Sequence, residues 1–249
     1  MNVQIASDLH IEYTTGDISA ADYIIPKAPI LILAGDIGSL YKHEQLEKFL
    51  KELAPNFKYI LYTPGNHEFY MQNDYKPLPF RKLIQRLYTL ENEISNLYIL
   101  NRSSVIIGNI CFIGSTLWSQ IPKDGIIPHF RLRIKGFSNF LYRNNHQKDV
   151  NYITETIQYS QQKNLKICVI THYPPSNNCL GPLHEKDKYK YLYSSDLENL
   201  LPGVNTWISG HVHWNYKMKI GDTYLIANQK GRERDRVQDF SKEFVWKID

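Results

Sequence analysis

The 249-residue sequence has few cysteines, and they are not arranged as a metal-binding or disulfide framework. The three cysteines are odd in number and show no Cys-x-x-Cys spacing. Cys111 and Cys168 lie inside apolar runs, so we expect both to be buried thiols. This usage favours a reducing compartment, and we predict a cytoplasmic protein.

Long apolar runs are also missing. No uninterrupted apolar stretch approaches the roughly 20 residues that a membrane span requires. Met1 leads directly into the first predicted strand, without the basic and apolar regions that precede a secretory cleavage site. We therefore expect neither a secretory signal nor a membrane partner.

The sequence has no strong excess of charge of either sign. It holds 29 Lys and Arg against 25 Asp and Glu, a net charge of +4 that hints at an anionic ligand without demanding nucleic acid. Acids alternate with arginines from Arg232 to Arg236, and we expect this segment to be a solvated terminal stretch. No repeat, low-complexity tract or linker interrupts the chain, so we predict one domain over residues 1–249.

Apolar periodicity predicts an α/β protein. Apolar residues three and four positions apart indicate helices at 46–53, 80–87 and 150–157. Ser195 to Glu198 is typical of a capping box that opens a short helix. In the first half, strands alternate with helices, which favours parallel strands with right-handed crossovers. The predicted strands are 3–7, 29–34, 58–63, 96–100, 105–107, 110–114, 166–171, 204–209, 214–220, 223–227 and 244–248.

Two long segments show no clear period. Residues 115–148 mix aromatic and basic side chains, and residues 176–193 are rich in Tyr and Lys. Segments of this length are either binding loops or packed excursions over a sheet edge, and the sequence leaves both open. We predict that residues 118–143 and 173–193 wall the active-site pocket and select the substrate.

Chemistry-bearing residues first occur where the first strand ends, at Asp8-Leu9-His10. In an extended segment, residues i and i+2 point to the same side, so Asp8 and His10 are expected to converge. A carboxylate oxygen and a neutral imidazole nitrogen suit a divalent transition metal. Alone this pair is weak evidence, because many surface turns carry Asp and His.

The same arrangement recurs at four more strand ends. Taken alone, His172 is typical of a hydrogen-bonded loop histidine. His211 and His213 alone would indicate a surface pair on a hairpin, and the Gly-Asn-His tripeptide alone would indicate a turn. Together the strand ends hold five of the nine histidines, at the sheet edge where α/β proteins bind ligands. Oxygen and nitrogen donors indicate manganese, iron, zinc, cobalt or nickel rather than a closed structural zinc site. The five groups are Asp8-x-His10, Gly35-Asp36, Gly65-Asn66-His67-Glu68, His172 and Gly210-His211-x-His213.

These blocks, in this order, resemble the signature of the calcineurin-like metallophosphoesterase superfamily. The resemblance spans Asp8 to His213, and Ser115 to Trp118, Ser195 to Leu197 and Asn228 to Gly231 look like small bacterial-type members. It implies a calcineurin-like four-layer sandwich, in which two mixed β-sheets are flanked by helices. It also implies two divalent metal ions, with manganese favoured and iron, zinc, nickel or cobalt as alternatives.

The resemblance implies a role for each motif residue. Asp36 would bridge the two metals, and His67 would be the acid beside the leaving group, which makes these two the expected catalytic residues. Asp8, His10 and His213 would hold the first metal, and Asn66, His172 and His211 the second.

The sequence departs from two branches of the superfamily. Residues 37–40 lack the Asp and Arg that follow the Gly-Asp block in protein serine/threonine phosphatases. Ser39 stands where purple acid phosphatases have a tyrosine ligand. Both branches are therefore disfavoured, and the residues that bind the phosphate oxygens stay unassigned.

The predicted function is hydrolysis of a phosphomonoester or phosphodiester by a hydroxide that bridges two metals. The substrate partner would be a small phosphorylated molecule, and oligomeric state is open. One alternative is a non-catalytic scaffold with this fold, against which the retained His67 and complete ligand set argue. Another is a nucleotide or nucleic-acid phosphodiesterase. The mild charge and the single domain disfavour nucleic acid, but Arg131 and Arg133 leave room for nucleotides.

Overall fold

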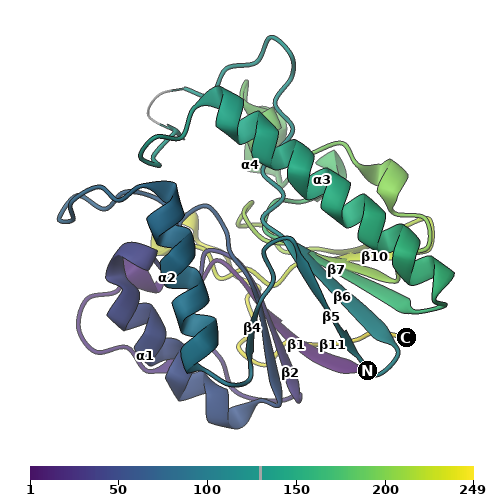
Figure 1. The fold of residues 1–249 in the computed structure, drawn as a ribbon, viewed down its shortest axis with the longest axis horizontal. Coiled ribbons are helices and arrows are strands. Elements are labelled where there is room, and N and C mark those ends of the chain that lie inside the picture. The colour runs from purple at the N-terminus through teal and green to yellow at the C-terminus, as the bar shows by residue number, and fades with distance from the viewer. Residues whose placement is uncertain (129–130) are drawn as a thin grey trace.

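The computed structural model describes residues 1–128 and 131–249. Residues 129–130, within the predicted pocket-wall segment 118–143, lie outside the described residues. Two mixed β-sheets pack face to face and helices cover their outer sides (Figure 1). The predicted α/β four-layer sandwich is therefore confirmed.

The first sheet has the strand order β11-β1-β2-β3-β4 within the described residues. β1, β2, β3 and β4 are parallel to one another, as the alternation of strands and helices predicts, and β11 is antiparallel to β1. Its strands are β1 (Asn2–Ala6), β2 (Ile30–Ala34), β3 (Tyr59–Thr63), β4 (Leu97–Ile99) and β11 (Val245–Lys247).

The second sheet has the order β5-β6-β7-β8-β10-β9 in the described part of the chain. Its central strands β6, β7, β8 and β10 are parallel, and an antiparallel strand closes each edge. Its strands are β5 (Ser103–Ile107), β6 (Ile110–Ser115), β7 (Lys166–Thr171), β8 (Thr206–Ile208), β9 (Lys217–Ile220) and β10 (Thr223–Ile226).

The main helices form the outer layers. α1 (His43–Leu53) and α2 (Phe80–Glu93) lie outside the first sheet, and α3 (Asn139–Gln162) lies outside the second (Figure 1). No helix of the described residues is both long and apolar enough to cross a bilayer. The shorter helices are α4 (Pro182–Glu185), η1 (Ile11–Tyr13), η2 (Ala20–Asp22), η3 (Leu40–Lys42), η4 (Ala54–Asn56), η6 (Asn177–Cys179), η7 (Lys190–Leu192), η8 (Glu198–Leu200) and η9 (Glu233–Asp235).

An apolar layer fills the space between the sheets. Ile5 and Ile32 of the first sheet face Phe112 and Ile170 of the second, and all four side chains are buried. The outer faces of the same strands pack on helices, so the central strands are apolar on both sides. Cys111 and Cys168 are buried free thiols, as predicted.

The prediction that residues 115–148 are irregular is wrong for the last part of that segment, because α3 begins at Asn139. Ser138 caps this helix by accepting a hydrogen bond from the Leu141 amide at 3.3 Å. Few side chains of the first turns are buried, so the apolar period that marks a helix is weak there. A tertiary contact holds this helix instead, because buried Asp149 pairs with Arg102 at 2.6 Å.

The predicted capping box at residues 195–198 is also wrong. The Ser195 hydroxyl accepts a hydrogen bond from the Gln120 amide, and the Glu198 carboxylate accepts bonds from Ser176 and Asn178. Both side chains are thus engaged by other loops, and only the 3₁₀ turn η8 forms. Tertiary contacts have overridden the local capping preference.

Candidate metal centre

The predicted site residues all gather where strands of the two sheets end at a common edge. The parallel register of neighbouring strands brings these ends together, because parallel strands finish on the same side of a sheet. β1, β2, β3, β7 and β8 are followed, in turn, by Asp8 and His10, by Asp36, by Asn66 and His67, by His172, and by His211 and His213.

The route by which Asp8 and His10 converge differs from the prediction. β1 ends at Ala6, and the two residues have φ values of 53° and 50°, in the left-handed region rather than the extended one. Asp36, His211 and His213 have positive φ as well. Each such residue costs on the order of 1–3 kcal/mol, and non-glycine residues of this kind cluster at functional sites.

Three motif glycines permit the close approach of the loops. A Cβ on Gly35 would lie 2.4 Å from the His172 ring. A Cβ on Gly65 would lie 2.3 Å from Asp36, and one on Gly210 would lie 2.5 Å from Asp8. Each glycine thus leaves room for a site side chain carried by another strand.

The first cluster consists of Asp8, His10 and His213. Nε2 of His10 lies 3.1 Å from Nε2 of His213, which lies 3.3 Å from an oxygen of Asp8. Both Asp8 oxygens also accept the His211 amide, which fixes the carboxylate. These nitrogen and oxygen atoms are close enough to hold one metal ion.

The second cluster surrounds the His172 ring. Its Nε2 lies 3.3 Å from Oδ2 of Asp36, 3.2 Å from Nδ1 of His211 and 3.0 Å from Oδ1 of Asn66. Asp36, His172 and His211 form a second group that could hold a metal. The sequence placed Asn66 in this group, and the structure brings it there.

Asp36 lies between the two clusters. The carboxylate oxygen that faces His172 is also 3.9 Å from Nε2 of His10. Burial alone would raise the pKa of Asp36, but His172, His67 and His10 hold that pKa well below its usual value. An ionised carboxylate between two sets of nitrogen donors can serve both of them.

The four histidines of the two clusters are held in one orientation by partners behind them. In each ring, one nitrogen faces an oxygen acceptor outside the cluster, which favours a proton on that nitrogen. When the ring is neutral, the other nitrogen then has a lone pair directed inward. The acceptors are Glu12 for His10 (3.1 Å), Ala34 O for His172 (3.0 Å), Leu192 O for His211 (3.2 Å) and Asp235 for His213 (2.6 Å).

Sequence reasoning missed Glu12, which lies behind two of the site histidines. One of its oxygens lies 3.1 Å from Nδ1 of His10 and 3.2 Å from Nδ1 of His67, while the Tyr13 hydroxyl is 3.3 Å from the same nitrogen of His67. These three acidic and imidazole groups could also form a metal site by distance. However, Nε2 of His10 faces the first cluster, so we assign Glu12 as the carboxylate behind both rings. Its position two residues after His10 was the available signal.

The expectation of a solvated stretch at residues 232–236 holds for Glu233, Arg234 and Arg236, which are exposed, but not for Arg232 and Asp235. The Asp235 oxygen that faces His213 also accepts the backbone and Nε of Arg232, both at 2.9 Å. Although burial raises the pKa of Asp235, these partners hold it far below its usual value. The segment folds back onto the first cluster, which its alternating charges did not reveal.

Glu68 supports the loops without entering the cavity. Its carboxylate accepts the amides of Asp36, Ile37 and Gly65 and the hydroxyl of Tyr62. Burial, and then the charge of Asp36, raises the pKa of Glu68 to about 8. The last residue of the Gly-Asn-His-Glu block therefore connects two strand exits.

A cavity of about 460 Å³, the reaction cavity, opens over the two clusters. Asp36, His67 and His211 contribute to its floor. Both predicted wall segments contribute to its sides, through Arg131 from the first and Tyr193 from the second. The substrate selectivity proposed for these segments stays a prediction.

Four arginines, the arginine rim, border the reaction cavity: Arg131, Arg133, Arg232 and Arg234. Arg131 donates to the Tyr193 hydroxyl at 2.9 Å and lies over that ring. The arginine rim faces a cavity that contains few acids, so the site suits an anionic ligand.

The comparisons with known proteins agree with this geometry. Residues 1–215 match the family model described as calcineurin-like phosphoesterase. The chain is 29% identical over 263 residues to uncharacterized protein L509 of Acanthamoeba polyphaga mimivirus, covering 94% of this chain and 92% of that protein.

A solved structure is similar in fold. Phosphopantetheinyl hydrolase from Mycobacterium tuberculosis superposes with a TM-score of 0.72 at 14% identity, covering 98% of this chain and 94% of that one. Since the family match covers most of the sequence, the chain belongs to the calcineurin-like phosphoesterase family. It is a metal-dependent phosphoesterase.

Proposed function

We propose that this calcineurin-like phosphoesterase hydrolyses phosphate esters with two divalent metal ions held at the paired clusters. The observation that carries the proposal is the common orientation of four imidazoles, each with an oxygen acceptor behind it and its other nitrogen facing inward. Four inward nitrogens beside two carboxylates suit cations once the rings are neutral, and this donor set fits the metals that the family implies.

Each ion has its own ligands in this proposal. Asp36 would bridge the pair because its oxygen lies between the two clusters. The mixed oxygen and nitrogen donors suit a divalent transition metal, with Mn²⁺ as our first candidate and iron, zinc, nickel or cobalt as alternatives. When bound, the two ions would lower the pKa of a water molecule and neutralise the charge of the phosphate. Asp8, His10 and His213 would hold the first ion, and Asn66, His172 and His211 the second.

His67 would protonate the departing oxygen of the ester. Its amide donates to Asp36 at 2.7 Å, and the residue lines the reaction cavity. Burial lowers the pKa of His67 below its usual value, although Asp36 and Glu12 partly offset that shift. When the ring is protonated, the Glu12 carboxylate accepts from Nδ1 and the other nitrogen can donate to the leaving group.

A count of bound metal tests the proposal. Elemental analysis of manganese-loaded protein should give two ions per chain, and the loaded protein should hydrolyse 4-nitrophenyl phosphate or bis(4-nitrophenyl) phosphate. His172→Ala should reduce the count to one ion. His43→Ala is the matched control, because His43 lies on α1 and contacts Glu47 of the same helix and the Arg86 carbonyl of α2. A single ion in the unaltered protein, or two in His172→Ala, would contradict the assignment.

A further inference from the structure

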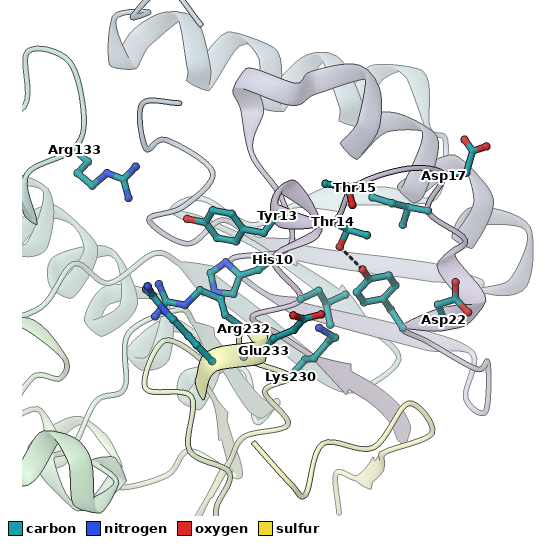
Figure 2. Close-up of a pocket in the computed structure, with 15 residues that line it drawn as sticks. His10, Tyr13, Thr14, Thr15, Asp17, Asp22, Arg133, Lys230, Arg232 and Glu233 are labelled. Atoms are coloured by element: carbon teal, nitrogen blue, oxygen red, sulfur yellow. Dashed lines mark hydrogen bonds between the residues drawn. The ribbon is translucent and has the colours of Figure 1, made fainter. Parts of the chain in front are cut away.

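A second and larger cavity adjoins the reaction cavity. This side chamber has a volume of about 860 Å³, within the range of sites that hold a nucleotide-sized organic molecule. His10 and Tyr13 line it at the end next to the metal centre (Figure 2). A simple phosphate group would fill only a small part of this space, so the side chamber has room for the rest of a substrate.

The two cavities share a boundary of three rim arginines. Arg133, Arg232 and Arg234 line both the reaction cavity and the side chamber. Figure 2 shows Arg133 and Arg232 at the same end of the chamber as Tyr13 and His10. A ligand that reached from the clusters into the chamber would therefore pass these guanidinium groups.

Arg133 and Arg232 are held in position by neutral and charged partners. Arg133 donates to the Met71 carbonyl at 3.3 Å and lies 5.4 Å from the centre of the Tyr70 ring. Asp235 accepts Nε of Arg232. Within residues 1–128 and 131–249, no hydrogen bond engages the terminal nitrogens of Arg232. A guanidinium that is fixed through Nε, with its terminal nitrogens outside that bond, suits two-point binding of a phosphate.

Tyr13 connects this boundary with the proposed acid. Its hydroxyl is 3.3 Å from Nδ1 of His67. Tyr13, Arg133 and Arg232 line the side chamber together, and the two arginines also line the reaction cavity with His67. The guanidinium groups therefore border the cavity that contains the proposed acid.

The far end of the side chamber has a different chemistry. Thr14, Thr15, Asp17 and Asp22 line it, and Figure 2 shows Asp17 and Asp22 at the end opposite Arg133 and Arg232. Hydroxyl and carboxylate groups suit a partner that donates hydrogen bonds, such as a sugar with several hydroxyl groups. The chamber thus has guanidinium groups next to the metal centre and exposed carboxylates and threonine hydroxyls at its far end, where Asp17 pairs with Lys48.

We propose that Arg133 and Arg232 form a binding subsite for a second phosphate of the substrate, and that the side chamber holds a hydroxylated organic group attached to it. This inference rests on the proposed function and names its substrate class: compounds with two linked phosphates and a sugar-like group, of which nucleoside diphosphates and their esters are examples. The reactive phosphate lies at the clusters, and the second lies between the guanidinium groups.

Binding of a matched ligand pair tests the subsite without turnover. AMP and α,β-methylene-ADP carry the same nucleoside and differ by one non-hydrolysable phosphonate unit. Titration calorimetry on manganese-loaded protein should show α,β-methylene-ADP binding roughly 10- to 100-fold more tightly, as expected for charge-assisted hydrogen bonds. Arg133→Gln and Arg232→Gln should each remove most of this difference.

Two further variants separate the causes. Arg133→Lys keeps the charge but loses the two-point geometry, so it should retain only part of the preference. Arg81→Gln is the matched control, because Arg81 is exposed at the start of α2, away from both cavities. It should bind both ligands as the unaltered protein does.

Equal affinity for the two ligands would overturn the inference. Equal losses for AMP and α,β-methylene-ADP in both glutamine variants would also overturn it, since the arginines would then serve the reactive phosphate alone. Because Arg232 contacts Asp235, its variant also reports on His213, whereas Arg133→Gln is independent of that link. A preserved binding preference in protein that hydrolyses neither 4-nitrophenyl ester would refute the proposed function but leave the subsite standing.

Discussion

The metal centre and the arginine rim are built in opposite ways. Side chains of the centre leave the chain within a few residues of a strand end, and the Asp8 side chain is fully buried. The rim arginines come from a long loop and the C-terminal segment, and the Arg234 side chain is 73% exposed. Backbone hydrogen bonds between strand exits lock the centre, whereas side-chain contacts hold the rim.

This difference separates two tasks. A metal centre must place several donors within a few tenths of an ångström, and only rigid elements do that. A substrate subsite can be assembled from loops, which vary without disturbing the scaffold. We therefore expect substitutions in the centre to act on metal and turnover together, and substitutions in the rim to act on substrate preference.

The largest effect should come from Asp36→Ala. Loss of the bridging carboxylate would remove an oxygen from both clusters and the acceptor of the His67 amide. We expect neither ion to bind tightly and turnover to fall by more than the roughly 10⁴-fold that loss of a general acid can cause. Metal analysis and ester hydrolysis measure this, with exposed Asp74→Ala as the control. If the variant retained two ions, Asp36 would not be needed for metal binding, and the contrast between the metal centre and the arginine rim would fail.

His67→Ala should separate the effect on turnover from the effect on metal binding. We expect turnover to fall by roughly 10²–10⁴-fold while both ions stay bound. The loss should be larger for an alkyl phosphate, whose leaving alkoxide needs a proton, than for a 4-nitrophenyl ester, whose leaving group is stable as an anion. Parallel kinetics and metal analysis decide this. Equal losses on the two ester types, or loss of metal, would show that His67 is not the acid.

Asp235→Asn tests the contact between the two regions. The change weakens the acceptor behind His213, so the first ion should bind roughly 10- to 100-fold less tightly, as is typical for a partner of a metal ligand. The second ion should be affected less, because Asp235 does not contact His172 or His211. Metal titration measures both affinities, with exposed Asp222→Asn as the control. Unchanged metal affinity would show that Asp235 supports only Arg232 of the arginine rim and not the first metal.

The smallest effect is a dependence of metal affinity on pH. Burial lowers the pKa of His172 and His213, but neighbouring carboxylates outweigh it and raise each pKa to about 9 in the metal-free protein. Below that pH an incoming ion must displace a proton, so affinity should rise between pH 6 and 9 and then level off. The slope should approach tenfold per pH unit for each proton released. Competition titrations against a chelator check it, and a flat profile would contradict the proton exchange.

Much of the fold and the centre could be predicted because the signals are local. An apolar run followed by glycine and an acid or imidazole marks a buried strand and its exit within about ten residues, and β2 with Asp36 is one example. Where tertiary contacts decided the structure, prediction failed. The start of α3 depends on Ser138 and on the Arg102–Asp149 pair, and Ser195 bonds to Gln120 instead of capping a helix.

The sequence by itself determined the donor atoms and their order along the chain, because the chemistry of a carboxylate or an imidazole belongs to the residue. Only the tertiary structure decided which groups face these donors from behind. Asp235 meets His213 across 22 residues, and Glu12 meets His67 across 55. The side chamber likewise exists because the first loop of the chain, Arg133 and the C-terminal segment meet. Such meetings depend on how loops pack over the whole fold, which no local pattern encodes.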